Sequence, residues 1–347
     1  MLSAGNGFIM QSEKYSRDNA GQSLKKYTLL KKGELAYNHG ASKAKQFGCC
    51  YQLEVDEALV PFVYHCFSVN KEYAPYISTV LNISTTERQL KKLVSSSVRM
   101  DGLLNISYDD YMTVELALPS MDEQQKVSCF LSLLEEKIKK QQKLVEHLKK
   151  YKRGVLKAIL EQRLRFKRSN GENYPKWESY TISEITDCLD RRRVPITSNE
   201  RIRGAYPYYG ANGIQDYVAD YIFDGEFVLL AEDGGHFNDF ATEPIAQYVS
   251  GKIWVNNHAH ILQAKCNTRF LFYALVHKDI RNYINNPSRG KLNQEDMQGI
   301  VIDVPCKEEQ ERIVDFMLKI DQNIEAKLNT LNRLVDFKKG LLQQLFI

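Results

Sequence analysis

Two histidines, His258 and His260, alternate inside a segment that has the pattern of paired strands. Alternation in a strand places both imidazoles on one face, where they could ligate a metal ion. No cysteine or carboxylate lies at a spacing that would complete such a site, so no metal is predicted. The neighbouring Glu232-Asp233 pair could take part in acid–base chemistry, but without a partner base it is typical of a solvated turn.

The motifs of nucleotide and cofactor chemistry are missing from the sequence. Gly290-Lys291 is followed by Leu292, and Asn285 stands where a phosphate-binding GxxxxGK[ST] loop needs its first glycine. No GxGxxG motif follows an expected strand. The Pro-Pro-Tyr type of turn with which adenine methyltransferases grip a flipped base is also absent. We therefore predict no catalytic residue, no cofactor and no enzymatic activity of this chain alone.

Basic and amide side chains could instead contact nucleic acid. The formal net charge of +4 permits such binding without requiring it. Cations position a protein on phosphates, whereas asparagine and arginine can pair with base edges. The expected phosphate contacts are Arg191, Arg192, Arg193, Arg201, Arg203, Lys252 and Lys291. The expected base contacts are Asn212, Asn256, Asn257 and Arg289.

Each of these contacts has an ordinary alternative. A single surface cation is commonly just a solvated charge, and Asn256-Asn257-His258 at a strand turn is equally compatible with a structural role. The tyrosines at 206, 208 and 209 are more typical of core and loop packing than of base stacking.

The cysteines and the hydropathy indicate a compartment. The seven cysteines form no CxxC pair, which is typical of free thiols in a reducing environment. No stretch approaches 18 apolar residues, and the N-terminus does not resemble a signal peptide. The sequence therefore predicts a cytoplasmic protein.

Internal repetition is the strongest pattern in the chain. The segments 116–160 and 302–346 align without a gap at a constant offset of 186. The matched positions include Pro119 and Pro305, and the pairs Glu123-Gln124 and Glu309-Gln310. Each copy has acidic residues in its first turn and basic residues towards its end, as helices do.

A heptad pattern fits both copies. The apolar seam is expected at Val127, Leu131, Leu134, Ile138, Val145 and Leu148, and at Ile313, Met317, Ile320, Ile324, Leu331 and Leu334. Polar interruptions recur at equivalent positions, Gln141 and Lys327, then Lys152 and Lys338. Two ordinary amphipathic surface helices are the alternative, but they would not repeat these interruptions. We therefore expect two long coiled-coil helices.

The helices divide the chain into four parts. Residues 1–119 and 163–305 are expected to be globular, and 120–162 and 306–347 helical. In the second globular part the expected elements are strands within 206–235, two strands paired around a polar turn in 251–264, and a core helix in 267–284.

The first globular part repeats this order weakly. The matched segments are 27–38 with 221–232, 59–69 with the core helix, and 104–119 with 290–305. Trp177 lies far ahead of Gly225, whereas the matching Gly33 is too close to the start of the chain to follow an equivalent tryptophan. At least one opening strand thus lacks a counterpart, and we expect a first domain that is shortened at its front.

The order domain–helix–domain–helix, with Pro-x-x-x-Glu-Gln at the start of each helix, resembles the specificity subunit of type I restriction–modification systems. Segments 206–218, 254–262 and 290–297 are similar to its target-recognition domains. The resemblance covers nearly the whole chain except the front of the first domain. It implies an α+β fold with two target-recognition domains separated by two long helices, which pair as an antiparallel coiled coil in a pseudo-two-fold tandem repeat.

The resemblance also implies a function without catalysis in this chain. Each domain would read one half of a bipartite site on double-stranded DNA. The partners would be methyltransferase subunits, two of them, that modify adenine N6, and motor-nuclease subunits. Glu123, Gln124, Glu309 and Gln310 would belong to the surface that docks the methyltransferases.

Three alternatives remain open at this stage. A self-contained modification enzyme would need the missing cofactor motifs. A defective or silent specificity subunit would read only one half-site, in keeping with the short first domain. A coiled-coil interaction protein would need no DNA at all.

Overall fold

Two long helices, α4 (Met121–Leu160) and α8 (Lys307–Leu345), are the longest elements of the computed structural model. The structure describes residues 1–3, 7–10, 25–43, 45–94, 103–284 and 290–346. The chain divides into unit 1, which comprises Met1–Leu144 and Leu328–Ile347, and unit 2, which comprises Val145–Lys327. Each unit therefore contains part of both long helices.

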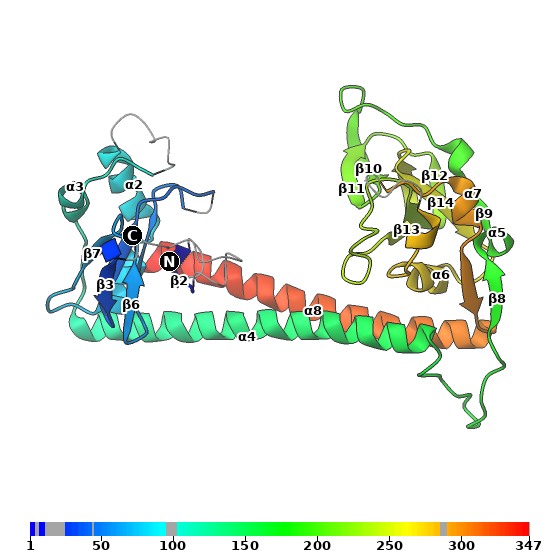
Figure 1. Ribbon diagram of the computed structural model, residues 1–347, viewed down its shortest axis with the longest axis horizontal. Coiled ribbons are helices and arrows are strands. Elements are labelled where there is room, and N and C mark those ends of the chain that lie inside the picture. The colour runs from blue at the N-terminus through cyan, green and yellow to red at the C-terminus, as the bar shows by residue number, and fades with distance from the viewer. Residues whose placement is uncertain (4–6, 11–24, 44, 95–102, 285–289, 347) are drawn as a thin grey trace. The chain divides into compact units, whose positions relative to one another are not determined.

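The long helices contact each other within each unit, side by side (Figure 1). In unit 1, Lys338 of α8 binds Glu135 of α4. In unit 2, Lys152 of α4 binds Asp321 of α8. All twelve predicted seam residues are buried or half-buried. The predicted α+β fold with two β-rich domains and two long helices in contact is confirmed.

A buried glutamine fixes the start of each long helix to the domain before it. Gln124, whose side chain is buried, accepts a hydrogen bond from the backbone N–H of Tyr73 at 3.0 Å and donates to the carbonyl of Pro119 at 2.9 Å. In unit 2 the same two bonds, at 3.0 and 2.8 Å, are made by Gln310, Asn267 and Pro305. Because a buried amide needs such partners, this contact explains why the glutamine recurs.

The described residues of unit 1 form short strands and, besides the long pair, three short helices. Its strands are β1 (Leu2–Ser3), β2 (Gly7–Phe8), β3 (Thr28–Lys31), β4 (Leu35–Asn38), β5 (Cys49–Gln52), β6 (Glu57–Val60) and β7 (His65–Phe67). Its helices besides the long pair are α1 (Ala74–Val80), α2 (Ser84–Leu93) and α3 (Tyr108–Met112). The strands form the sheets β1-β2, β3-β6 and β5-β4-β7.

Unit 2 contains a larger sheet. Its strands are β8 (Glu178–Thr181), β9 (Thr186–Cys188), β10 (Arg203–Gly210), β11 (Gly213–Val218), β12 (Phe223–Ala231), β13 (Ala246–Val255), β14 (Ala259–Ala264) and β15 (Val301–Val304). Its short helices are α5 (Ile182–Ile185), η3 (Asp190–Arg192), α6 (Thr268–Leu275), η4 (Arg281–Tyr283) and α7 (Gln294–Gln298). Six strands pair in the order β11-β10-β13-β12-β14-β9, and β15 pairs with β8.

The central strand β12 is buried on both faces of this sheet. Val228 and Leu230 pack into a core that includes α6, whereas Phe227 and Leu229 pack into a second core on the opposite face. This alternation follows from the two-residue period of a strand. The sheet is thus packed on both faces of β12, and it carries the loops at the ends of its strands.

Two details of the sequence-based expectations were wrong. Residues 251–264 do form two strands around a polar turn, but β13 and β14 do not pair with each other, because β12 lies between them. Residues 59–69 do not form a helix: they contain the end of β6 and all of β7. The glutamine contacts identify α1 as the counterpart of α6 instead, because Tyr73 and Asn267 directly precede these helices.

Candidate nucleic-acid interface

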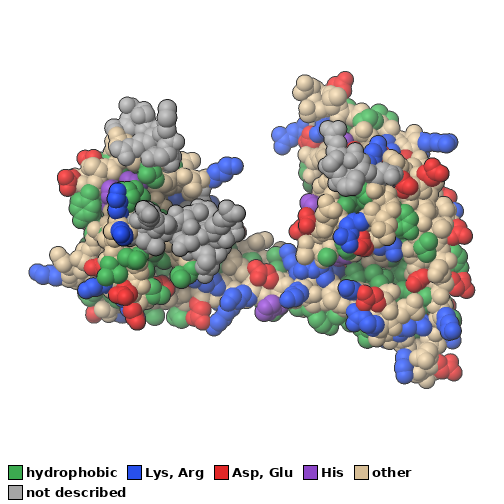
Figure 2. All heavy atoms as spheres, viewed as in Figure 1, with side chains coloured by type: hydrophobic (Ala, Val, Ile, Leu, Met, Phe, Trp, Pro, Cys, Tyr) green, Lys and Arg blue, Asp and Glu red, His purple; other side chains and the backbone are tan. Residues whose placement is uncertain are grey.

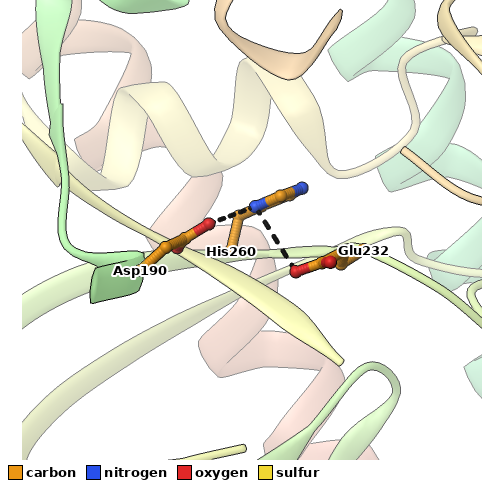
Figure 3. A group of neighbouring side chains, drawn as sticks. All are labelled: Asp190, Glu232 and His260. Carbon is orange, nitrogen blue, oxygen red and sulfur yellow. Dashed lines mark hydrogen bonds and ion pairs between the residues drawn. The ribbon is translucent and has the colours of Figure 1, made fainter. Parts of the chain in front are cut away.

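A buried histidine organises one end of the unit 2 sheet. His260 on β14 is 1% exposed, and its Nδ1 lies 2.5 Å from Oδ2 of Asp190 (Figure 3). Its Nε2 lies 2.8 Å from the carbonyl oxygen of Leu292. Both ring nitrogens face acceptor oxygens. The histidine thereby joins η3, the sheet and the segment before α7.

Arg193 belongs to the same cluster. Its guanidinium donates to Oε2 of Glu232 at 2.7 Å and to the carbonyl of Ala259 at 2.9 Å, and it lies 3.3 Å from Asp190. Burial alone would raise the pKa of Asp190, but the hydrogen bond from His260 and the charge of Arg193 outweigh burial and lower this pKa. The Arg193 side chain is 14% exposed, and its guanidinium offsets part of the negative charge of Asp190 and Glu232.

The cluster has the composition of a metal site but not the free donors of one. One ligand atom from each of Asp190, Glu232 and His260 lies within 4.8 Å of the others. The histidine nitrogens are already hydrogen-bonded, and Glu232 pairs with both Arg193 and Lys291. A cation would have to displace these partners, so we assign the cluster a structural role.

This role leaves the other two arginines of the triplet on the surface. Arg191 is exposed on η3. Arg192 is exposed as well, and its guanidinium carbon lies 5.0 Å from the ring centroid of Phe223. The cluster around His260 fixes the short helix that carries both side chains. Both cations are exposed and carried by a helix that is held in place, an arrangement that suits contact with phosphates.

A shallow hollow gathers amide and imidazole groups beside this cluster. It is lined by Ala211, Asn212, Gly213, Ile214, Gln215, Asp233, Gly234 and His258. Asn212, after β10, donates to the carbonyl of Gly234 at 2.8 Å. Nδ1 of His258 lies 2.5 Å from Asp233, and both side chains remain more than one-third exposed. The fold thus brings together loops from three distant parts of the chain.

The predicted residues near the hollow differ in accessibility. Asn256 is buried, with its amide on Gln215 at 3.1 Å and its oxygen accepting from the backbone of His258 at 2.8 Å. Asn257 is exposed. Lys291 is half-exposed and lies 3.4 Å from Glu232. Asn256 therefore shapes the turn, while its neighbours face solvent.

Three further predicted cations lie near the β10–β11 hairpin. Lys252 stands over the rings of Tyr221 and Tyr206, at 4.6 and 6.0 Å. Arg201 stacks on Tyr208 at 4.2 Å and lies 3.4 Å from Asp216.

Arg203 is exposed on the same hairpin, and Arg289 lies outside the described residues. Sequence reasoning missed Gln215 and the pairing of Asp233 with His258, because only the folded sheet brings these residues together.

The surface charge is mixed. On the face shown in Figure 2, basic and acidic side chains are interspersed, in line with the small net charge. Binding to a polyanion would therefore depend on local groups of cations more than on the field of the whole chain.

The four residues predicted to dock partner subunits also differ. Gln124 and Gln310 are buried in the contacts described above, and Glu309 is 0% exposed. The Glu309 carboxylate accepts from Arg165 at 2.7 Å and from the indole of Trp177 at 3.0 Å. Among the four, Glu123 alone has an exposed side chain that a partner could contact.

Part of the chain is similar in sequence to known proteins. Residues 174–334 match the family described as "Type I restriction modification DNA specificity domain". A Haemophilus influenzae protein that carries the name of a type I restriction enzyme specificity subunit is 37% identical over 139 residues, which are 39% of this chain and 35% of that protein. A Mycoplasma pneumoniae protein with a similar name is 28% identical over 151 residues, 42% of this chain and 40% of that protein. The chain thus spans less than half the length of these relatives.

Solved structures show the same fold over most of the chain. One is the crystal structure of a type I restriction–modification S subunit from M. genitalium, which superposes with a TM-score of 0.56 at 18% sequence identity. The superposition covers 93% of this chain and 85% of that chain. Among the described residues, no helix combines the length and apolar character that crossing a membrane requires.

Proposed function

We propose that the chain is a specificity subunit of a type I restriction–modification system, and that it selects the DNA sequence on which partner subunits act. It binds a bipartite site on double-stranded DNA and directs adenine-N6 methylation or restriction, without catalysing either. One observation carries this proposal: the same scaffold, a domain tied by a buried glutamine to a long helix, occurs twice. Duplicated readers on paired helices suit a target with two separate halves.

In unit 2 the proposed DNA contacts divide by chemistry. Exposed Arg191, Arg192, Arg203 and Lys252 neutralise phosphates, an effect that weakens as salt rises. Groups around the hollow, Asn212, Asn257, His258 and Lys291, offer the donors and acceptors that base edges require. Arg193 and Asn256 support these groups from inside the domain.

The proposed partners are two methyltransferase subunits and the motor-nuclease subunits of a type I complex. Glu123, at the exposed start of α4, is the proposed docking contact for a methyltransferase. Its carboxylate would pair with a basic group of that partner.

Co-expression with the cognate methyltransferase and genome-wide mapping of N6-methyladenine tests the function. We expect a motif with two specified halves around an unread spacer, and no methyl transfer by the purified chain alone. A continuous motif, or methylation without a partner, would contradict the proposal. Asn212→Ala should relax bases in one half only, whereas Asn199→Ala, at an exposed position away from the hollow, should leave the motif unchanged.

A second candidate is a subunit that reads only one half-site. The surroundings of one equivalent pair of residues favour it: His65 of unit 1 lies against Tyr37 and Tyr108, whereas His260 of unit 2 contacts Asp190. Methylation at sites specified by one half alone would support this candidate against the bipartite reader. A chain that supports no methylation but still binds its partner would instead be a silent subunit or an interaction protein.

A further inference from the structure

Each long helix carries a lysine inside its apolar seam. Lys152 in α4 and Lys338 in α8 occupy d positions of the heptad pattern, and the two positions are equivalent in the repeat. A lysine in such a seam costs stability unless its ammonium group finds an acceptor. Polar seam residues commonly specify register and partner.

The acceptors of the two lysines are equivalent as well. Nζ of Lys338 lies 2.5 Å from Oε1 of Glu135, and Nζ of Lys152 bonds Oδ1 of Asp321. Glu135 and Asp321 also occupy equivalent positions of the repeat, so one interaction is built twice. The step forward along α4 from Glu135 to Lys152 equals the step back along α8 from Lys338 to Asp321. In both pairs the two residue numbers have the same sum, as the numbering of antiparallel helices requires.

The competing alignments lack these acceptors. A slip of one heptad returns every a and d residue to the seam, so apolar packing alone discriminates weakly against it. Such a slip would place Ser128 or Gln142 opposite the lysine of α8. It would place Val314 or Leu328 opposite the lysine of α4. None of these side chains is a carboxylate, so both ammonium groups would lose their partners in either direction.

We infer that the pairs Lys152–Asp321 and Lys338–Glu135 determine the register of the helix pair by excluding its one-heptad neighbours. A one-heptad slip moves one helix along the other by about 10 Å. That is close to the rise of three base pairs of DNA, at about 3.4 Å each. The register would therefore set the number of unread base pairs between the half-sites. This last consequence rests on the proposed function, whereas the register itself does not.

The pair in unit 2 has a third member. The hydroxyl of Tyr273 on α6 donates to Oδ2 of Asp321 at 2.7 Å, and Nζ of Lys152 lies 5.4 Å from the centroid of the tyrosine ring. Tyr273 thus orients the carboxylate for the lysine. An exchange of the two charges would replace the acceptor of this hydroxyl by a lysine, so the test uses a Tyr273→Phe background in every sample.

Spin labels report the register directly. They are attached through keto amino acids at exposed positions 139 of α4 and 312 of α8, which lie well apart along the helix axes, and the seven native cysteines stay untouched. The charge-reversed protein carries K152E and K338E, and the charge-exchanged protein adds E135K and D321K. The control is K140E, which breaks an exposed pair with Glu136 within α4.

Pulsed dipolar spectroscopy should give one label distance in the parent, the control and the charge-exchanged protein. The charge-reversed protein should lose that distance, with shifts of about 10 Å or a mixture of distances. An unchanged distance in the charge-reversed protein would overturn the inference. If that protein does not fold, the charge-exchanged protein decides: restored folding and distance support the inference, and failure to restore them overturns it.

Methylation mapping of the same proteins separates the two proposals. The charge-reversed protein should direct methylation to sites with an altered or mixed spacer. The charge-exchanged protein should restore the parental spacer. If the parent yields no bipartite motif, the proposed function fails while the label distances still decide the register. If the motif is bipartite but its spacer is unaffected by a measured change of register, the link between register and spacing is wrong.

Discussion

Two histidines at equivalent positions of the two units are surrounded by different chemistry. His65 on β7 and His260 on β14 each lie beside the central strand of their sheet. Nε2 of each donates to a backbone carbonyl, that of Ile106 at 3.0 Å and that of Leu292 at 2.8 Å. Ile106 and Leu292 are themselves separated by the offset of the repeat, so the two rings occupy one position of a shared scaffold.

The other side of each ring shows the difference. In unit 2, Nδ1 of His260 faces Asp190 and lies 3.8 Å from Glu232. In unit 1, the His65 ring lies against aromatic rings, with centroids 5.8 Å from both Tyr37 and Tyr108. One unit thus surrounds its histidine with charge and the other with aromatic rings.

The same contrast recurs at the start of the long helices. Glu309 is buried by Arg165 and Trp177, whereas its equivalent Glu123 is exposed. The strand β15 pairs with β8, but the equivalent residues 115–118 form no strand. The backbone of Glu115 instead exchanges two hydrogen bonds with the side chain of Gln89, at 2.8 and 3.0 Å.

A single segment of unit 2 accounts for these differences. Residues 163–193 contain the partners of Glu309, the whole of β8, and Asp190 with its arginines. The two units share the glutamine contact between domain and long helix. They differ in the segment that packs around that contact. The shared part positions the domains, and the divergent part is free to carry different recognition surfaces.

Replacing each histidine by alanine should have the largest and most unequal effect. His260→Ala leaves buried Asp190 without its main donor and should lower the free energy of unfolding of unit 2 by about 3–5 kcal/mol. His65→Ala removes one hydrogen bond and partly buried ring contacts, and should cost unit 1 about 1–2 kcal/mol. Hydrogen exchange with mass spectrometry over β12 and β4 measures both losses. Equal losses would show that the charged surroundings add nothing.

The two glutamates offer a second unequal pair. Glu309→Gln keeps the shape but removes the charge that faces Arg165 and Trp177, and should cost about 2 kcal/mol. Glu123→Gln, on the exposed equivalent, should change stability by less than about 0.5 kcal/mol. Both tryptophans of the chain, Trp177 and Trp254, lie in unit 2, so urea unfolding followed by their fluorescence reports the first variant. A similarly small loss of unfolding free energy in both variants would mean that the buried contacts of Glu309 do not stabilise the unit.

The two glutamines should behave alike, which tests the shared part of the comparison. Gln124→Leu and Gln310→Leu each leave a backbone N–H and a carbonyl without their amide partner. Each should cost its own unit about 1–2 kcal/mol. Hydrogen exchange at the first turns of α1 and α6 should rise to a similar degree. A strong effect in one unit alone would show that the tie between domain and helix is not equivalent.

The sequence predicted these features where a pattern was local or repeated. The long helices followed from heptads that recur with their polar breaks, so a second copy verified each position. The role of Gln124 and Gln310 could not be predicted from the sequence. Their backbone partners Tyr73 and Asn267 lie 51 and 43 residues away, and no local pattern marks these partners. The pairing of β13 was mistaken because alternation identifies a strand but not its neighbour.

The candidate site divided in the same way. The sequence placed Arg191, Arg192 and Arg193 together as three equal cations, but the turn after η3 directs only Arg193 to buried acidic partners. The expectation of a helix in the apolar run 59–69 was wrong, because a run of this length is compatible with either a strand or a helix. Tertiary contacts decided both cases.

The smallest expected effect is a pH dependence confined to unit 2. The fold lowers the pKa of Asp190 below its ordinary value of 3.8, so the carboxylate contributes stability above that pH. This contribution is lost as the pH falls through the lowered pKa. His260 and Arg193 contact the same carboxylate, and Glu232, which pairs with Lys291, lies within 4.8 Å of it. Acid unfolding followed by tryptophan fluorescence should therefore steepen below about pH 3.8 in the parent and less so in Asp190→Asn. Because aromatic rings surround His65, hydrogen exchange over β4 should not differ between these two proteins, and a difference there would mean that Asp190 does not act locally.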